Sequence, residues 1–175
     1  MRYVAFLKAI NVGGHVVKMD ALRRLFETAG FTGVETFIAS GNVVFDAAAK
    51  SAPTLERRIE AHLEKALGYP VATFLRSLPE LSGIAQHMPF DGSDGGARVY
   101  IAFLKETPGR EASATLLTFS NEIDDLRIHK REVYWLCRSN FSDSTFSGPI
   151  LEKTLKAETT IRNTNTVRKL AAKYC

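Results

Sequence analysis

Cysteine is scarce in this sequence, since Cys137 and Cys175 are the two among 175 residues. Two cysteines build no disulfide framework, and their spacing is unlike that of a paired-cysteine metal site. Cys137 lies in the apolar segment VYWLCR, where a cysteine is typically a small buried side chain. The sequence therefore excludes a disulfide-stapled domain, and it predicts no metal site.

Long apolar runs are also absent, because no stretch approaches the ~18 residues that a membrane helix needs. The N-terminal MRYVAFLKAINVGG is interrupted by Lys8 and lacks a cleavage site of small residues, so we interpret it as a strand and not as a signal peptide. With 45% hydrophobic and 24% charged residues, the composition is that of a soluble globular protein. We therefore expect a cytoplasmic location and no membrane partner.

A recognisable catalytic constellation is missing too. The four histidines are scattered without ligand spacing. His15, next to Gly14, is a candidate general base, but no nucleophile accompanies it. Asp124 and Asp125 begin an expected strand and should face water, and adjacent side chains of an extended chain point apart, which makes them a poor metal pair. The type of reaction and any cofactor are therefore left open.

Positive charge is in modest excess. The formal net charge is +4 and the pI is near 9.1, which favours anionic partners. The excess is too small to indicate nucleic-acid binding by itself. A small anionic molecule and a nucleic acid both stand as candidate partners, and the sequence leaves the oligomeric state open.

The chain contains an internal repeat. The segment RYVAFLK at 2–8 returns as RVYIAFLK at 98–105, and the stretch from Tyr3 to Lys8 matches the stretch from Tyr100 to Lys105 with a single change of Val to Ile. A short match arises easily by chance, so the order of the downstream elements has to repeat as well.

The first half has the element order of a ferredoxin-like unit. Its expected elements are, in order, a strand at 2–10, a helix at 20–29, the strands VETFI and VVF, a helix at 54–67 and the strand VATFLR. A loop with Gly13 and Gly14 follows the first strand, and a hairpin turn at 39–42 joins the two middle strands. The order is therefore β-α-β-β-α-β.

The second half repeats this order. Its expected elements are a strand at 98–105, a helix at 109–118, the strands LRI and VYWLCR around a turn at 129–131, a helix at 149–156, a short strand at TTI and a helix from about Thr164. Ser77 and Glu80 form a capping box that opens a bridging helix, and the segment DGSDGG at 91–96 is the expected boundary. We therefore predict an α+β protein with two tandem ferredoxin-like units at 1–90 and 97–175. The alternative is one undivided α+β domain.

The polar run in TIRNTNTVRKL raises a question, because a helix start needs only one short polar residue. Apolar residues follow helical spacing from Val167 onward, so a helix begins near 163–165. One interpretation makes Asn163 or Thr164 the N-cap and leaves the other polar residues in solvent, and it is favoured for this segment taken alone. The other uses the free N–H groups of the helix start, beside Arg162, as an anion site.

A second candidate site is the loop in LKAINVGGHVVKM. Glycines allow a ligand to approach the backbone, and Lys8 and Lys18 flank the pair Gly13-Gly14. The spacing is that of neither a Walker A motif nor a dinucleotide fingerprint. The alternative is a loop that needs glycine only to turn, with Lys8 reaching solvent from the end of its strand. Its repeat partner Lys105 has no such loop behind it.

Four blocks, FLKAINVGGHVVKM, FIASGNVVF, LEKTL and TIRNTNTVRKL, occur in the order and approximate spacing of family signature blocks. The sequence resembles, over nearly its whole length, the bacterial family catalogued as domain of unknown function 1697. The resemblance implies a ferredoxin-like α+β architecture. The polar signature of the family falls here on Lys8, Asn11, Gly13, Gly14, Lys18, Ser40, Gly41, Asn42, Arg162, Asn163, Asn165 and Thr166. At Lys8, Ala39 and Thr164 the family has arginine, glutamine and an aromatic residue instead, and lysine lacks the bidentate fork of arginine.

These polar residues lie mostly in loops, where a rigid scaffold commonly carries its functional groups. We hypothesise that the loops converge into one cleft that binds a small phosphate-bearing anion. The expected ligand residues are Lys8, Asn11, Gly13, Gly14, Lys18, Ser40, Asn42, Arg162, Asn163, Asn165 and Thr166. Three alternatives stand beside this hypothesis. The first is nucleic-acid binding through the sheet, although SGNVVF lacks the pattern of aromatic residues that this would require. The second is a transferase-type enzyme. The third is a structural role, in which the polar side chains tie the C-terminal helix to the first unit.

Overall fold

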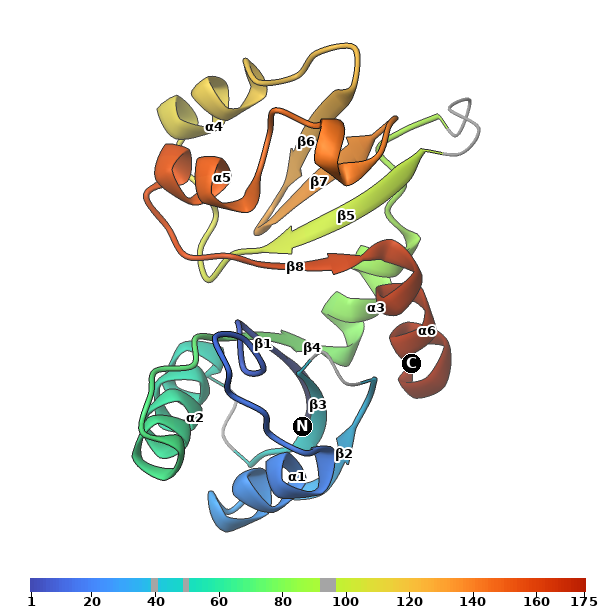
Figure 1. Cartoon of the computed structure of the whole chain (residues 1–175). Coiled ribbons are helices and arrows are strands. Elements are labelled where there is room, and N and C mark those ends of the chain that lie inside the picture. Colours follow the sequence, from blue (N-terminus) through green and yellow to red (C-terminus); the bar gives the residue numbers. More distant parts are fainter. Residues whose placement is uncertain (39–40, 49–50, 92–96) are drawn as a thin grey trace. The chain divides into compact units, whose positions relative to one another are not determined.

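The computed structural model describes residues 1–38, 41–48, 51–91 and 97–175, and it shows two four-stranded antiparallel sheets with helices (Figure 1). The chain divides into two compact units. Unit 1 comprises Met1–Gly83 together with Leu170–Cys175, and unit 2 comprises Ile84–Lys169. The predicted α+β class with two tandem ferredoxin-like units is confirmed. Within the described ranges, no helix has the length and apolar character required to cross a membrane.

Unit 1 has the ferredoxin-like element order. Its elements are β1 (Arg2–Leu7), α1 (Met19–Thr28), β2 (Thr32–Thr36), β3 (Asn42–Asp46), α2 (Ala52–Leu67) and β4 (Thr73–Ser77), and α3 (Leu78–Gln86) follows β4 directly. The sheet order is β2-β3-β1-β4, and every neighbouring pair is antiparallel. The first copy of the repeat, in β1, therefore lies in the interior of its sheet.

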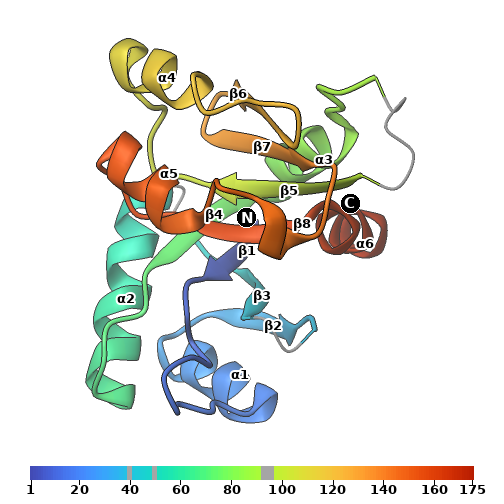
Figure 2. The same cartoon turned by 45° about the horizontal axis from the view of Figure 1, so that its top comes forward.

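Unit 2 repeats the arrangement. Its elements are β5 (Arg98–Phe103), α4 (Arg110–Leu117), β6 (Asp124–His129), β7 (Glu132–Cys137), a 3-10 turn η1 (Phe141–Asp143), α5 (Gly148–Leu155) and β8 (Thr160–Asn163), followed directly by α6 (Thr164–Tyr174). The sheet order β6-β7-β5-β8 places the second copy, in β5, where β1 lies in unit 1. Helices α4 and α5 lie side by side (Figure 2). The predicted boundary segment 91–96 lies outside the described residues except for Asp91.

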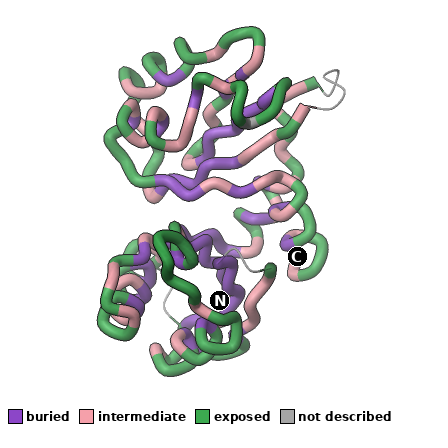
Figure 3. Tube along the Cα trace, viewed as in Figure 1, coloured by how far each residue is buried: buried purple, intermediate pink, exposed green. Residues whose placement is uncertain are grey.

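Alternation along the repeated strands decides which side chains enter each core. Successive side chains of a strand point to opposite faces of the sheet. In unit 1 the core residues of the first copy are Tyr3, Ala5 and Leu7. In unit 2 the corresponding residues against the core are Tyr100, Ala102 and Leu104. The two copies of the repeat therefore direct matching side chains to the same face of their sheets. Figure 3 shows the buried residues of both units along these strands.

Helix ends in the first half of the chain follow local chemistry. Helix α2 has a proline in its first turn and ends at Gly68, whose φ of +82° is readily adopted by glycine. The predicted capping box at α3 is confirmed. The Ser77 backbone N–H and the Ser77 hydroxyl both donate to Glu80 Oε2, at 2.8 and 2.9 Å. The Glu80 N–H donates back to Ser77 Oγ at 3.4 Å.

The expectation that both carboxylates at the start of β6 face water is wrong for Asp124. This side chain is 0% exposed, and it accepts hydrogen bonds from Trp135 Nε1 and from the Ser144 hydroxyl, each at 2.7 Å. Asp125 points to the other face and forms an ion pair with Arg127. Strand alternation sends one of two adjacent residues inward, and two identical side chains give the sequence no means of telling which.

Candidate functional site

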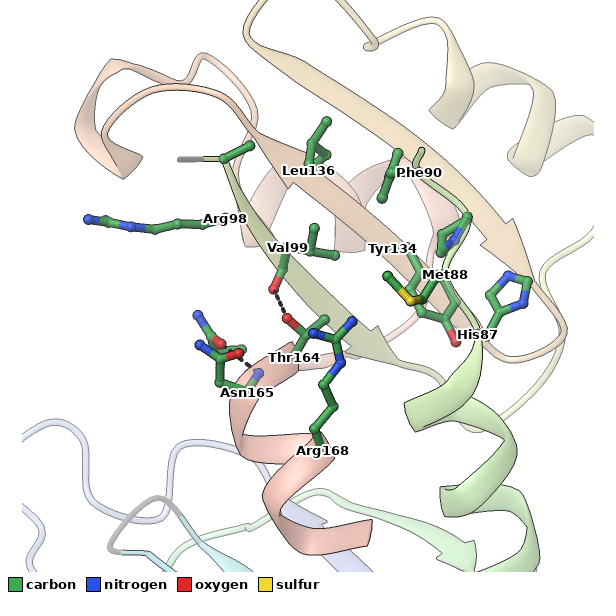
Figure 4. A pocket seen from close by; sticks show the side chains of 13 residues that line it. His87, Met88, Phe90, Arg98, Val99, Tyr134, Leu136, Thr164, Asn165 and Arg168 are labelled. Atoms are coloured by element: carbon green, nitrogen blue, oxygen red, sulfur yellow. Dashed lines mark hydrogen bonds between the residues drawn. The ribbon is translucent and has the colours of Figure 1, made fainter. Parts of the chain in front are cut away.

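A cavity of about 300 Å³ opens in unit 2 on the sheet face that points away from the core (Figure 4). Val99 of β5 and Leu136 of β7 are direct partners in the ladder and form part of its floor. Their neighbours along the strands, Tyr100 and Trp135, face the core instead. The complete lining is His87, Met88, Pro89, Phe90, Ala97, Arg98, Val99, Tyr134, Leu136, Asn163, Thr164, Asn165 and Arg168.

The start of α6 is fixed to the sheet by the polar run singled out in the sequence. Strand β8 pairs with β5 as far as Asn163, which lies opposite Tyr100. The Thr164 hydroxyl then donates to the Val99 carbonyl at 3.0 Å, which ties the first turn of the helix to β5. Asn163 Oδ1 accepts the Asn165 backbone N–H at 2.8 Å and thereby caps the helix. Asn163 and Thr164 thus have structural tasks, and both also line the cavity.

Arg168 is an exposed residue that provides a positive charge at the lining of the cavity. It lies one turn into α6, and Figure 4 shows its guanidinium directed toward the middle of the lining residues, whereas Arg98 extends away from them. Over the described part of the chain, the Arg168 guanidinium makes no hydrogen bond or ion pair. None of the thirteen described residues of the lining carries a carboxylate. The cavity is therefore positive in character.

The opposite wall of the cavity is apolar and aromatic. Met88 and Phe90 come from the segment after α3, and Tyr134 comes from β7. The His87 ring stacks on the His129 ring with 4.2 Å between centroids and lies 4.9 Å from the Tyr134 ring. Burial, followed by the nearby His129, lowers the pKa of His87 below its ordinary value. His87 is therefore uncharged at neutral pH, and it adds a ring face to this wall.

Arg162 lies in β8 next to the cavity lining, not in it. Its side chain is buried, and its Nη1 donates to Thr160 Oγ1 at 2.8 Å and to the Ile161 carbonyl at 2.9 Å. Burial lowers the pKa of Arg162 to about 10. Arg76 of β4 forms the same bond in unit 1, from Nη1 to the Leu75 carbonyl at 2.7 Å. Because both arginines donate from Nη1 to the carbonyl of the preceding residue, we interpret Arg162 as a structural residue. Thr166, on the first turn of α6, is half-buried and also lies outside the lining.

The predicted loop residues of unit 1 lie together on one surface loop between β1 and α1. Gly13 and Gly14 are exposed with φ of +68° and +85°, as expected for a turn that requires glycine. Asn11 Oδ1 accepts the Val17 N–H at 2.7 Å and closes the loop. The loop is further anchored by Tyr69, whose hydroxyl donates to the Ile10 carbonyl at 3.0 Å and whose ring stacks on His15 at 3.8 Å.

The charged and turn residues of unit 1 are placed as follows. Lys8 is half-buried, and its backbone N–H donates to the Ala72 carbonyl at 2.9 Å, while Lys18 is exposed before α1. Asn42 is buried, and its amide donates to the Phe37 carbonyl at 3.0 Å, which closes the turn between β2 and β3. Ser40 lies outside the described residues. The convergence of these residues with those of α6 stays a prediction.

The cavity residues that the sequence analysis did not identify as site residues include His87, Phe90, Arg98, Tyr134 and Arg168. Helical spacing offered a signal for Arg168, because residues three apart share a face of a helix and Asn165 precedes it by three. The sequence offered no signal for His87 or Phe90. Both residues lie in the segment after α3, and His87 reaches the cavity by packing its ring 4.9 Å from that of Tyr134.

Comparison with known proteins supports the architecture. The model of the family described as "Protein of unknown function (DUF1697)" matches residues 1–134. A solved structure, that of the conserved bacterial protein SP0830 from Streptococcus pneumoniae, is 26% identical to the chain with a TM-score of 0.73. The alignment covers 98% of this chain and 97% of that one. No curated protein matches the chain.

Proposed function

The chain belongs to the family of proteins of unknown function DUF1697, and for this member we propose that unit 2 binds a small phosphate-bearing anion in the cavity at the start of α6. The observation that carries the proposal is Arg168, a cation directed into a cavity whose described lining holds no carboxylate. Arginine presents a planar fork of donors that matches the oxygens of a phosphate.

The start of α6 adds neutral donors to this charge. The side chains of Asn163 and Asn165 both line the cavity, and each amide group carries two N–H donors. Helix α6 has no acidic residue in its first turn, so the positive end of its dipole is not offset there by a carboxylate. A phosphate would therefore meet one full charge, two amide groups and a favourable helix end.

The loop of unit 1 carries other residues of the predicted ligand set. Its exposed Gly13 and Gly14 leave room for a ligand, because a Cβ added at either would meet no atom within 4 Å. Lys18 supplies an exposed charge next to this loop. The resemblance places all three in the polar signature of the family, so a variant at Lys18 is tested alongside the variant at Arg168.

Thermal melting of the purified chain with sugar phosphates and nucleotides tests the proposal. A ligand at ~100 times its dissociation constant stabilises the folded chain by about 2.7 kcal/mol, which raises the melting temperature by roughly 5–10 °C for a protein of this size. Arg168→Ala should remove this shift, whereas Lys169→Ala, its exposed neighbour outside the lining, should keep it. Wild-type protein that no phosphate compound stabilises would contradict the proposal.

A further inference from the structure

We infer that the ligand of this cavity is a nucleoside monophosphate, a planar heterocycle joined to a phosphate through a sugar. The inference rests on the proposed anion binding. It adds the heterocycle, the part of the ligand that would lie away from the Arg168 charge. The cavity has two chemically different ends, with donors around the start of α6 and ring or aliphatic side chains opposite them (Figure 4). A simple inorganic anion would use only the first end.

The floor of the apolar end is a platform of side chains from neighbouring strands. Val99 and Leu136 lie directly opposite each other, and Tyr134 lies two residues from Leu136 on the same face of β7. Such neighbours are about 5 Å apart across a ladder and about 7 Å apart along a strand. Tyr134 and Leu136 are buried beneath this surface, and the half-buried Val99 and Phe90 are its more accessible side chains. The face of any base packs on such a surface, because stacking requires no particular pattern of donors.

The rings beside this platform are already held in place. The Arg127 guanidinium lies 5.7 Å from the centroid of the Phe90 ring, and His87 is stacked on His129. The Tyr134 hydroxyl donates to the Ile84 carbonyl at 3.5 Å, and this buried side chain supports the rings around it. A ring surface that is ordered before binding loses little conformational freedom when a base stacks on it.

The size of the cavity limits the ligand. Its volume of about 300 Å³ is at the lower end of the range for small-molecule sites. That volume suits one nucleotide and is small for a dinucleotide cofactor. The polar and apolar ends also lie within one cavity, so a single compact molecule can reach both. A mononucleotide carries both chemistries, a phosphate and a base, within that length.

Calorimetric titration with three related compounds tests the inference. Adenosine 5′-monophosphate carries both ends, ribose 5-phosphate carries only the anion, and adenosine carries only the ring. We expect the monophosphate to bind the wild-type chain at least about ten times more tightly than either of the other two, because base stacking alone contributes roughly five- to a hundredfold. Trp135 fluorescence and melting confirm that each variant is folded.

Two variants separate the ends. Arg168→Ala should weaken binding of the monophosphate and of ribose 5-phosphate by roughly ten- to a hundredfold and leave adenosine unchanged. Phe90→Ala should weaken the monophosphate and adenosine and leave ribose 5-phosphate unchanged. Lys169→Ala should alter none of the three.

The outcomes distinguish the inference from the proposed function. Equal affinities for adenosine 5′-monophosphate and ribose 5-phosphate would overturn the nucleotide and leave the anion site standing. Equal affinities for the monophosphate and adenosine would overturn the anion site itself. Failure of all three compounds to bind would overturn both.

Discussion

The two units begin the helix after their last strand in different ways. Helix α3 follows β4 and α6 follows β8, and the two junctions align as FLRSLPEL and TIRNTNTV. Arg76 lies opposite Val4 in one sheet, and Arg162 lies opposite Ile101 in the other. Val4 and Ile101 are matching residues of the repeat. The junctions therefore occupy equivalent positions in their units, and their differences can be compared residue by residue.

The difference lies in what occupies the helix start. In unit 1, Glu80 folds back onto Ser77, so a carboxylate of the chain itself fills the positive end of α3. In unit 2, the residue equivalent to Glu80 is Thr166, and Asn163 is the cap. The start of α3 is thus occupied by a carboxylate of the chain, whereas the start of α6 lies beside a cavity that Arg168 lines. Two positions change the charge of the junction, namely the third residue of the helix, Glu80 or Thr166, and the fifth, Ser82 or Arg168.

The cores of the two units differ as well. In unit 1 three phenylalanine rings meet, with Phe31 at 4.6 Å and Phe26 at 5.4 Å from Phe45. In unit 2 the place of Phe45 is taken by Trp135, whose indole N–H is satisfied by the buried Asp124. In unit 2 the aromatic cluster is joined to a buried polar network through the hydrogen bond between Trp135 and Asp124, and such a network is costly to break in part.

The largest expected effect follows from this contrast in the cores. Asp124→Ala should destabilise the chain by about 2 kcal/mol, because it leaves the buried Trp135 indole N–H without its acceptor, while the half-buried Ser144 hydroxyl keeps the Phe146 carbonyl as an acceptor. Urea unfolding followed by the fluorescence of Trp135, the only tryptophan, reports the loss from unit 2. Asp125→Ala is the matched control and should cost less than about 1 kcal/mol, as a half-exposed ion pair does. Equal losses for both variants would show that the network adds no stability.

A smaller effect is expected from giving α6 the helix start of α3. Thr166→Glu places a carboxylate at the position of Glu80, where it can fold back onto the cap and oppose an incoming phosphate. We expect binding of ribose 5-phosphate to weaken by about tenfold, or roughly 1.4 kcal/mol, while the melting temperature of the free chain stays the same or rises.

Thr166→Gln is the control for that variant. Glutamine has nearly the same size and can also fold back, but it adds no charge. It should therefore bind the phosphate compound as the wild type does. If Thr166→Gln and Thr166→Glu weaken binding equally, the effect is steric, and the charge of the junction does not distinguish the two units as we argue.

The fold could be predicted from the sequence because its signals are local or repeated. The copies of YVAFLK fix two equivalent strands, and glycine and proline mark the ends of α2 where the structure has them. The capping box of Ser77 and Glu80 requires only residues three apart, and it forms as predicted. Such features depend on a few neighbouring residues and on one hydrophobic face per element.

The cavity could be predicted only in part, because its residues meet through the sheet. The polar run around Asn163 and Asn165 stands out in the sequence, and both residues line the cavity. Phe90 and Tyr134 join them only after three strands have paired. The inward turn of Asp124 depends on the register of β6 against β7, which two adjacent aspartates leave undetermined in the sequence. Patterns among neighbouring residues therefore do not predict contacts that depend on the register between strands.

The smallest expected effect concerns pH and the stacked histidines of unit 2. Burial and the neighbouring His129 lower the pKa of His87 in the folded state. Above about pH 6.5, His87 is uncharged in both the folded and the unfolded chain and does not affect stability. Below that pH the unfolded chain takes up the proton first, so the free energy of unfolding falls. His87→Phe should reduce the decline of melting temperature between pH 7 and pH 5 relative to the wild type. Parallel declines in the two proteins would contradict the assignment to His87.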